Sequence, residues 1–200
     1  MPSILTVCTG NICRSPLAAL LLAQKLASFA PTVTSAGTHA LADMEVTAET
    51  ARLAHAAGVA DEATAAHRAR RLTDEHLNNA DLILAMTRGH RREIADIAPH
   101  RQRATFTLRE FARIADEMTD DELRIGHRSE DPASVDPSAR VRAMAAAVAH
   151  RRGFAPRPAN PDDDDVDDPY GGTWDDYVHS AAQLEPAVDS VVRAVTVALG

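Results

Sequence analysis

Short apolar segments alternate with Ala- and Leu-rich segments over the first 115 residues, and this alternation constrains the fold most strongly. The apolar segments at residues 4–7, 32–36, 81–86 and 105–108 have the length of β-strands, and residues 16–29, 47–57, 88–98 and 109–115 have helical patterns. Segment 81–86 has no polar alternation, which is typical of a strand buried on both faces of a sheet. The pattern predicts an α/β fold: a four-stranded parallel sheet with helices on both faces.

The composition fits one domain over residues 1–200, because 45% of the residues are hydrophobic and 25% are charged. The formal net charge of -8 argues against broad binding to nucleic acid or to an anionic membrane surface. The sequence has no apolar run of about 18 residues and no signal-peptide pattern at its amino terminus. We therefore expect a cytoplasmic protein with neither a membrane nor a nucleic-acid partner.

The regular alternation breaks down between about residues 116 and 165. An Ala-rich segment at 138–152 predicts a helix, but polar, proline-rich and acidic sequence surrounds it. We interpret this part as an insertion or a mobile excursion, because so long a connection is unusual in a compact domain. Apolar residues then recur at helical intervals over 173–199 and predict a closing helix.

Residues 7–16, Val-Cys-Thr-Gly-Asn-Ile-Cys-Arg-Ser-Pro, join the first predicted strand to the first predicted helix. Such a loop points successive backbone amides at one spot, and the helix dipole adds positive potential there. Gly10 and Asn11 tolerate the unusual backbone angles that the loop needs. Arg14 can bind two oxygens of a phosphate through its planar guanidinium. The segment therefore predicts a site for a phosphate-sized anion, at the strand end where such sheets bind ligands.

Cys8 is the predicted nucleophile of this site, because the same positive field favours its thiolate form at neutral pH. We expect the sulfur to attack phosphorus while Arg14 and the loop amides stabilise the transferring group. The Ser15 hydroxyl is placed to donate a hydrogen bond to the thiolate. Cys8 and Cys13 are the only cysteines, too few and too close for a disulfide framework or a four-ligand zinc site. We expect neither a metal nor a cofactor.

Segment 7–16 resembles the phosphate-binding loop of the low-molecular-weight protein tyrosine phosphatase family, bacterial type. Segments 35–38, 67–73 and 80–86 extend the similarity to about residue 111. The resemblance implies one flavodoxin-like phosphatase domain that hydrolyses protein phosphotyrosine through a phosphocysteine intermediate. It implies a supporting hydrogen-bond network of Asn11, Ser15, Ser35 and His67. The remaining residues of the implied phosphate-binding loop are Thr9, Gly10, Ile12 and Cys13.

An insertion at about 112–165, before the general-acid loop, departs from the family pattern. The leaving phenolate needs a proton, and six acidic residues compete to supply it: Asp162, Asp163, Asp164, Asp165, Asp167 and Asp168. We select Asp168 because Pro169 stiffens the following backbone, and because Asp168-Pro169-Tyr170 resembles the family's acid loop. Tyr170 is placed to flank a planar substrate. Trp174 is either a second wall or an anchor for the last helix.

Three other functions compete with tyrosine phosphatase activity. Protein arginine phosphatases resemble this family but carry Thr at the position of Ile12, so Ile12 favours tyrosine specificity. The stem of phosphoserine is too short to bring its phosphate to the thiolate at the bottom of a deep slot. A phosphotyrosine-containing protein is therefore the expected partner. Thiol-linked arsenate reduction commonly uses cysteines in a distant segment, and none follows Cys13. A noncatalytic phosphoprotein-binding module would not need Cys8, Arg14 and Asp168 together.

The remaining motifs receive structural or regulatory interpretations. Cys13 is predicted to trap an oxidised Cys8 as a disulfide, which the resemblance supports. We expect other histidines, such as His39, His90 and His100, at the surface. The basic cluster is expected to be a solvated helix end, with attraction of acidic phosphopeptides as the alternative; it comprises Arg91, Arg92, Arg101 and Arg103.

Overall fold

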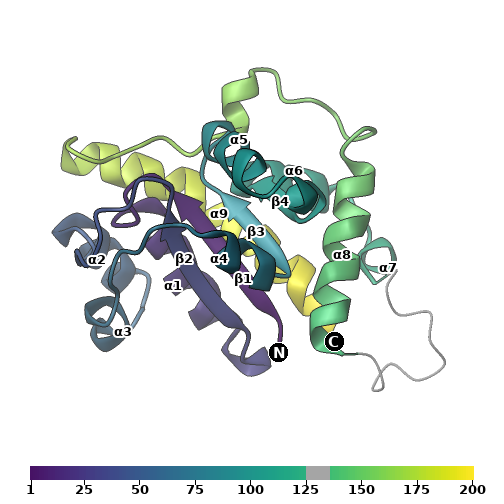
Figure 1. Cartoon of the computed structure of the whole chain (residues 1–200), viewed down its shortest axis with the longest axis horizontal. Helices are drawn as coiled ribbons and strands as arrows, with labels where there is room; N and C mark the ends of the chain where they lie inside the picture. The colour runs from purple at the N-terminus through teal and green to yellow at the C-terminus, as the bar shows by residue number, and fades with distance from the viewer. Residues whose placement is uncertain (125–135) are drawn as a thin grey trace.

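A computed structural model describes residues 1–124 and 136–200 (Figure 1). Four parallel strands form one sheet in the order β2-β1-β3-β4. Their bounds are Ser3–Cys8 for β1, Thr32–Gly37 for β2, Leu82–Ala85 for β3 and Thr105–Thr107 for β4. The predicted α/β fold with a four-stranded parallel sheet is confirmed.

Helices cover both faces of the sheet (Figure 1). The α-helices are α1 Arg14–Lys25, α2 Ala48–Ala56, α3 Asp61–Ala65, α4 Asp74–Asn79, α5 Arg88–Ile97, α6 Leu108–Asp116, α7 Asp120–Leu123, α8 Pro137–Arg151 and α9 Trp174–Leu199. Short 3-10 helices are η1 Ala27–Phe29, η2 Pro99–Ala104 and η5 Pro161–Asp164. No helix in the two described ranges is long and apolar enough to cross a membrane.

The alternation of side chains along β1 and β3 explains the two cores. Ile4 and Leu82 point to the larger core, in which α1, α6, α8 and α9 pack. Leu5 and Ile83, one residue further along each strand, point to the smaller core with residues of α4 and α5. Because both strands are buried on both faces, the sequence of β3 shows no polar alternation.

The first helix is shorter than the sequence predicts. Residues 16–29 suggested one continuous helix, but α1 ends at Lys25 and η1 follows it. Ala30 has a positive φ of 46°, which ends the helical path and turns the chain into β2. The short helices α3, α4 and α7 were not predicted, since a helix of four to six residues leaves little periodicity in the sequence.

The predicted insertion contains a packed helix. Val141, Met144 and Val148 recur on one face of α8 and are fully buried in the larger core. A mobile excursion is therefore the wrong description of residues 137–151, while residues 125–135 of the predicted insertion lie outside the described residues. The acidic run at residues 162–165 also contacts the rest of the fold, because Asp164 forms an ion pair with Arg113 at 2.8 Å.

Candidate active site

The predicted phosphate-binding loop connects the carboxyl end of β1 to the amino end of α1. Cys8 ends the strand and Arg14 begins the helix, and both side chains are buried. Asn11 takes a left-handed φ of 59°, which turns its backbone amide toward the sulfur. Cys8 Sγ accepts that N–H at 3.3 Å and lies 3.0 Å from Ser15 Oγ. Two polar groups thus lie within hydrogen-bonding reach of the Cys8 sulfur.

Asn11 is held by four groups from three segments. Its Nδ2 donates to Ser15 Oγ at 2.9 Å and to Ser35 Oγ at 2.8 Å. Its carbonyl oxygen lies 2.8 Å from His67 Nε2, and its Oδ1 accepts the backbone N–H of Arg70 at 3.0 Å. The structure therefore brings together the four residues expected in the supporting network.

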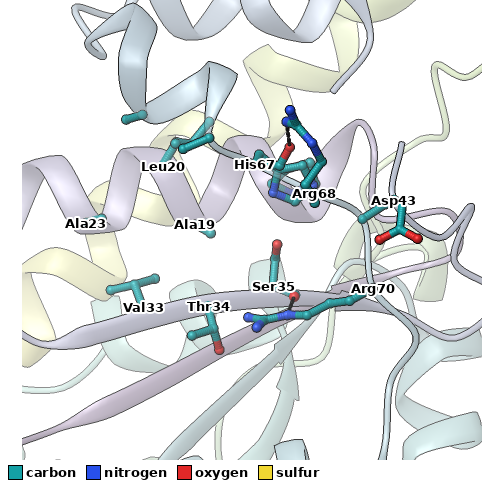
Figure 2. A pocket seen from close by; sticks show the side chains of 14 residues that line it. Ala19, Leu20, Ala23, Val33, Thr34, Ser35, Asp43, His67, Arg68 and Arg70 are labelled. Carbon is teal, nitrogen blue, oxygen red and sulfur yellow. Dashed lines mark hydrogen bonds between the residues drawn. The ribbon is translucent and has the colours of Figure 1, made fainter. Parts of the chain in front are cut away.

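Ser35, His67 and Arg70 also line a pocket of about 480 Å³ between α1 and β2 (Figure 2). Burial lowers the pKa of His67, so its ring is neutral and Nε2 carries the proton donated to Asn11. Arg70 was not expected in this network. Arg70 contacts Asn11 through its backbone N–H, which nearly every residue type has, so the sequence cannot indicate this contact.

Arg14 and Asp168 lie in direct contact although 154 positions separate them in the sequence. Arg14 Nη2 is 2.6 Å from Asp168 Oδ2, and Nη1 donates to Val166 O at 3.0 Å. The Arg14 side chain is 4% exposed and that of Asp168 is 50% exposed. The Nε atom of Arg14 is buried without a hydrogen-bond partner among the described residues. An oxyanion that binds to the Arg14 guanidinium would therefore have to replace the Asp168 carboxylate, which already contacts it.

A small pocket of about 160 Å³ opens over the sulfur of Cys8. Leu41, which the sequence analysis missed, stands in its wall with Asp168 and Tyr170. The rest of the wall is the loop itself: Cys8, Thr9, Gly10, Ile12, Cys13 and Arg14. The lining thus combines the charged groups of Arg14 and Asp168 with the apolar or aromatic side chains of Ile12, Leu41 and Tyr170.

Trp174 does not line this pocket. It packs beside the buried cluster that includes Ile12 and Tyr177, and the guanidinium of Arg52 lies 3.9 Å from the centre of its ring. Of the two predicted roles, the structure shows the anchor for α9.

Cys13 points away from the solvent. Its sulfur lies 3.6 Å from the hydroxyl of Tyr177 and 3.8 Å from Thr47 Oγ1. Burial raises the pKa of the Cys13 thiol, and these hydrogen bonds oppose the shift only in part. Cys13 is therefore protonated at neutral pH.

His90 was expected at the surface, and that prediction is wrong. Its side chain is buried, with Nε2 2.8 Å from Thr9 Oγ1 and Nδ1 2.9 Å from Thr87 Oγ1. Burial, followed by the charge of Arg14, lowers its pKa to about 4. His90 and Ile94 lie four residues apart on the inward face of α5, a spacing that could have revealed the burial. His39 and His100 are exposed, as expected.

Within the described ranges, no group of three or more His, Cys, Asp or Glu is arranged to hold a metal ion. A sequence model of the low molecular weight phosphotyrosine protein phosphatase family matches residues 3–124. The chain belongs to this family. The match covers β1 to β4 together with the whole phosphate-binding loop, and ends before the segment that carries Asp168.

Relatives within the low molecular weight phosphatase family carry two different names. A protein-arginine-phosphatase of Geobacillus stearothermophilus is 41% identical over 108 residues, which is 54% of this chain and 70% of the relative. The low molecular weight protein-tyrosine-phosphatase Etp of Escherichia coli K12 is 45% identical over 97 residues, or 48% of this chain and 62% of the relative.

Solved structures of such phosphatases match nearly the whole chain. The YwlE arginine phosphatase from Geobacillus stearothermophilus aligns with a TM-score of 0.67 and 28% identity over 98% of this chain and 94% of that one. The tyrosine phosphatase amsI of Erwinia amylovora aligns with a TM-score of 0.65 over 96% and 91% of the two chains. At 23% identity, the latter likeness supports the fold alone.

Proposed function

We propose that the chain hydrolyses phosphotyrosine in proteins through a phosphocysteine intermediate. The observation that carries the proposal is one pocket that holds the sulfur of Cys8, the buried guanidinium of Arg14 and the carboxylate of Asp168. A nucleophile, a phosphate ligand and a proton donor are the groups that this reaction needs.

The first half of the reaction transfers the phosphoryl group to sulfur. The Cys8 thiolate attacks phosphorus, a sulfur–phosphorus bond forms, and the bond to the tyrosine oxygen breaks. Asp168 in its acid form gives its proton to that oxygen. Arg14 and the loop amides bind the equatorial oxygens, where negative charge is concentrated during transfer.

The second half releases phosphate. The Asp168 carboxylate takes a proton from water, whose oxygen attacks phosphorus, and the electron pair of the sulfur–phosphorus bond returns to Cys8. Ser15 Oγ and the Asn11 amide, at 3.0 and 3.3 Å from the sulfur, stabilise the departing thiolate.

The contact between Arg14 and Asp168 suggests how substrate binding prepares the acid. A phosphate that takes up the donors of Arg14 must displace Asp168 Oδ2, which lies 2.6 Å from Nη2. The freed carboxyl group is half exposed, and so is able to turn toward the leaving oxygen. Binding and acid placement are thereby coupled through one guanidinium.

The pocket wall favours an aromatic substrate. Ile12, Leu41 and Tyr170 supply apolar and aromatic surface in the lining, which suits the ring of phosphotyrosine. Phosphoarginine is the second candidate, because the relative named protein-arginine-phosphatase is 41% identical over 70% of its own length. A guanidinium would gain little from these apolar walls, so we place phosphotyrosine first.

The test is phosphate release from a phosphotyrosine peptide and a phosphoarginine peptide in parallel, with EDTA present. Wild type is expected to prefer phosphotyrosine, and Cys8→Ser to release no phosphate from either. A preference for phosphoarginine would retain the nucleophile and overturn the substrate class. No turnover of either peptide by wild type would overturn the proposed function.

The role of Asp168 predicts a dependence on the leaving group. Asp168→Asn is expected to lower kcat for a phosphotyrosine peptide by roughly 100-fold or more, because the phenolate then leaves without a proton. The loss should be smaller for p-nitrophenyl phosphate, whose leaving group is stable as an anion. Steady-state kinetics of both substrates checks this; equal losses would place Asp168 outside the acid role.

The proposal extends to the protein's surroundings. The family implies phosphoprotein substrates, and we propose that the whole chain acts on them in the cytoplasm as one domain with an insertion at about 112–165. Two buried free thiols suit a reducing compartment. The net charge of -8 supports a protein partner over nucleic acid or a membrane.

A further inference from the structure

Helix α5 presents a row of arginines on its outer side. Arg88, Arg91 and Arg92 stand at i, i+3 and i+4, so they share one face of the helix. They line a pocket of about 350 Å³ beside the β4 edge of the sheet. Its full lining is Arg88, Arg91, Arg92, Ala95, Gln102, Thr105 and Arg152. Four of these seven residues are arginine, in a chain whose net charge is -8.

The carboxylates around this pocket do not balance its positive charge. Arg91 Nη1 and Arg152 Nε share the single buried carboxylate of Glu110, at 2.6 and 2.8 Å. Arg92 is exposed and has no carboxylate partner among the described residues. Four arginines line the pocket and three carboxylates of the described residues pair with them, Glu110 as described and Asp162 and Asp165 with Arg88, so the excess is the one positive charge of Arg92.

Arg88 connects this pocket to the active site. Its guanidinium pairs with Asp162 and Asp165, and its backbone N–H donates to Asp165 Oδ1 at 2.7 Å. Asp165 is three residues before Asp168. Two residues after Arg88 on α5, His90 contacts Thr9 of the phosphate-binding loop. The first turn of α5 thus contacts the phosphate-binding loop through His90 and lines the arginine pocket through Arg88 and Arg91.

We propose that the pocket lined by Arg88, Arg91, Arg92 and Arg152 binds acidic side chains that flank the phosphotyrosine of a protein substrate. This inference rests on the proposed phosphotyrosine hydrolysis. A substrate segment that leaves the pocket over Cys8 past Arg88 reaches Arg92, where a carboxylate finds an arginine with free donors. Because the arginines are partly exposed, the contact mainly speeds the association of the substrate and orients it. Added salt screens the charges and weakens this effect.

The experiment compares two phosphotyrosine peptides that differ only in their flanks, one with Glu and one with Gln on both sides. For wild type at low salt, kcat/KM is expected to be roughly 1.5- to fivefold higher for the Glu peptide, the range of an exposed charge pair. Arg92→Gln should bring that ratio close to one. The matched control is Arg71→Gln, an exposed arginine beside β2 at the opposite edge of the sheet, which should keep the wild-type ratio.

Hydrolysis of p-nitrophenyl phosphate, which has no flanking residues, gives the reference rate for each variant. A ratio near one in wild type, or a raised ratio that Arg92→Gln leaves intact, overturns the acidic subsite while the proposed phosphatase activity stands. Turnover of p-nitrophenyl phosphate without turnover of either peptide overturns the proposed substrate class, and the subsite with it.

Discussion

Gly37, the last residue of β2, touches the phosphate-binding loop so closely that a larger residue does not fit. A Cβ atom built on Gly37 would lie 2.4 Å from the carbonyl oxygen of Thr9 and 3.0 Å from Cα of Ala40. Both are backbone atoms, which cannot swing aside as a flexible side chain can. The neighbouring amides of Thr38 and His39 donate to the carbonyls of Cys8 and Thr9, at 2.9 and 3.0 Å. Gly37 therefore sets how near β2 comes to the loop.

Replacement of Gly37 should accordingly displace the loop. Gly37→Ala is expected to lower kcat at least tenfold and to destabilise the fold by about 1–3 kcal/mol, the range for an overpacked site. Gly153→Ala is the matched control, because no heavy atom lies within 4 Å of the added Cβ there. Phosphatase kinetics and urea unfolding of both variants decide the matter, and wild-type kcat in Gly37→Ala would contradict the steric argument.

The two cysteines predict a defined product of oxidation. Cys13 is the other cysteine of the chain and lies in the same pocket wall as Cys8, so it is the one thiol that can lose its proton and capture a sulfenic acid on Cys8. Mild peroxide should therefore give a mass loss of two hydrogens and a loss of activity that a thiol restores. Cys13→Ser should instead add oxygen atoms. Addition of oxygen to the wild type without a disulfide would refute the prediction.

Among the elements, α8 is tied to β4 and α6 by the arginine that follows its last residue. Arg152 Nε donates to Glu110 at 2.8 Å, Nη2 donates to the carbonyl of Thr105 at 2.9 Å, and the guanidinium lies 4.4 Å from the ring centre of Phe106. Glu110 also closes the capping box at the start of α6. One side chain thus joins α8 to β4 and α6.

Loss of the Arg152 side chain should weaken the attachment of α8 without changing the catalytic groups around Cys8. Arg152→Gln is expected to destabilise the fold by about 1–3 kcal/mol, because the buried Glu110 loses one of its two arginines. Arg151→Gln removes only a partly exposed pair with Glu122 at 3.1 Å, and should change stability much less than Arg152→Gln does. Urea unfolding measures both, and equal effects would argue against the anchoring role.

The elements also show which parts of the fold and of the site can be predicted from the sequence. Strands β1 and β3 and the loop between Cys8 and Arg14 were predictable, because burial on two faces and an anion nest each impose local residue patterns. The contacts of Arg70 and His90 with the loop were not, because they join segments about 60 and 80 positions apart. The pairing of Arg14 with Asp168 likewise depends on how the chain returns to the sheet after α8.

For the whole molecule, the buried histidine couples stability to pH. The unfolded chain binds a proton on His90 below about pH 6.5, whereas the folded protein does so only below about pH 4. Between these values the unfolded state holds more protons, so stability falls as pH falls. Burial and Arg14 cause the shift, while Asp168 and Asp165 oppose it.

Comparison of wild type with His90→Gln isolates this contribution, since glutamine keeps a polar side chain but does not titrate. Between pH 7 and pH 5, wild type is expected to lose about 2 kcal/mol more unfolding free energy than the variant, from the integrated difference in proton binding. His67 and His76, whose pKa values burial also lowers, are present in both proteins and cancel. Urea unfolding at both pH values measures the difference. Parallel losses in the two proteins would mean that His90 is reached by protons in the folded state, and that its contact with Thr9 opens near pH 5.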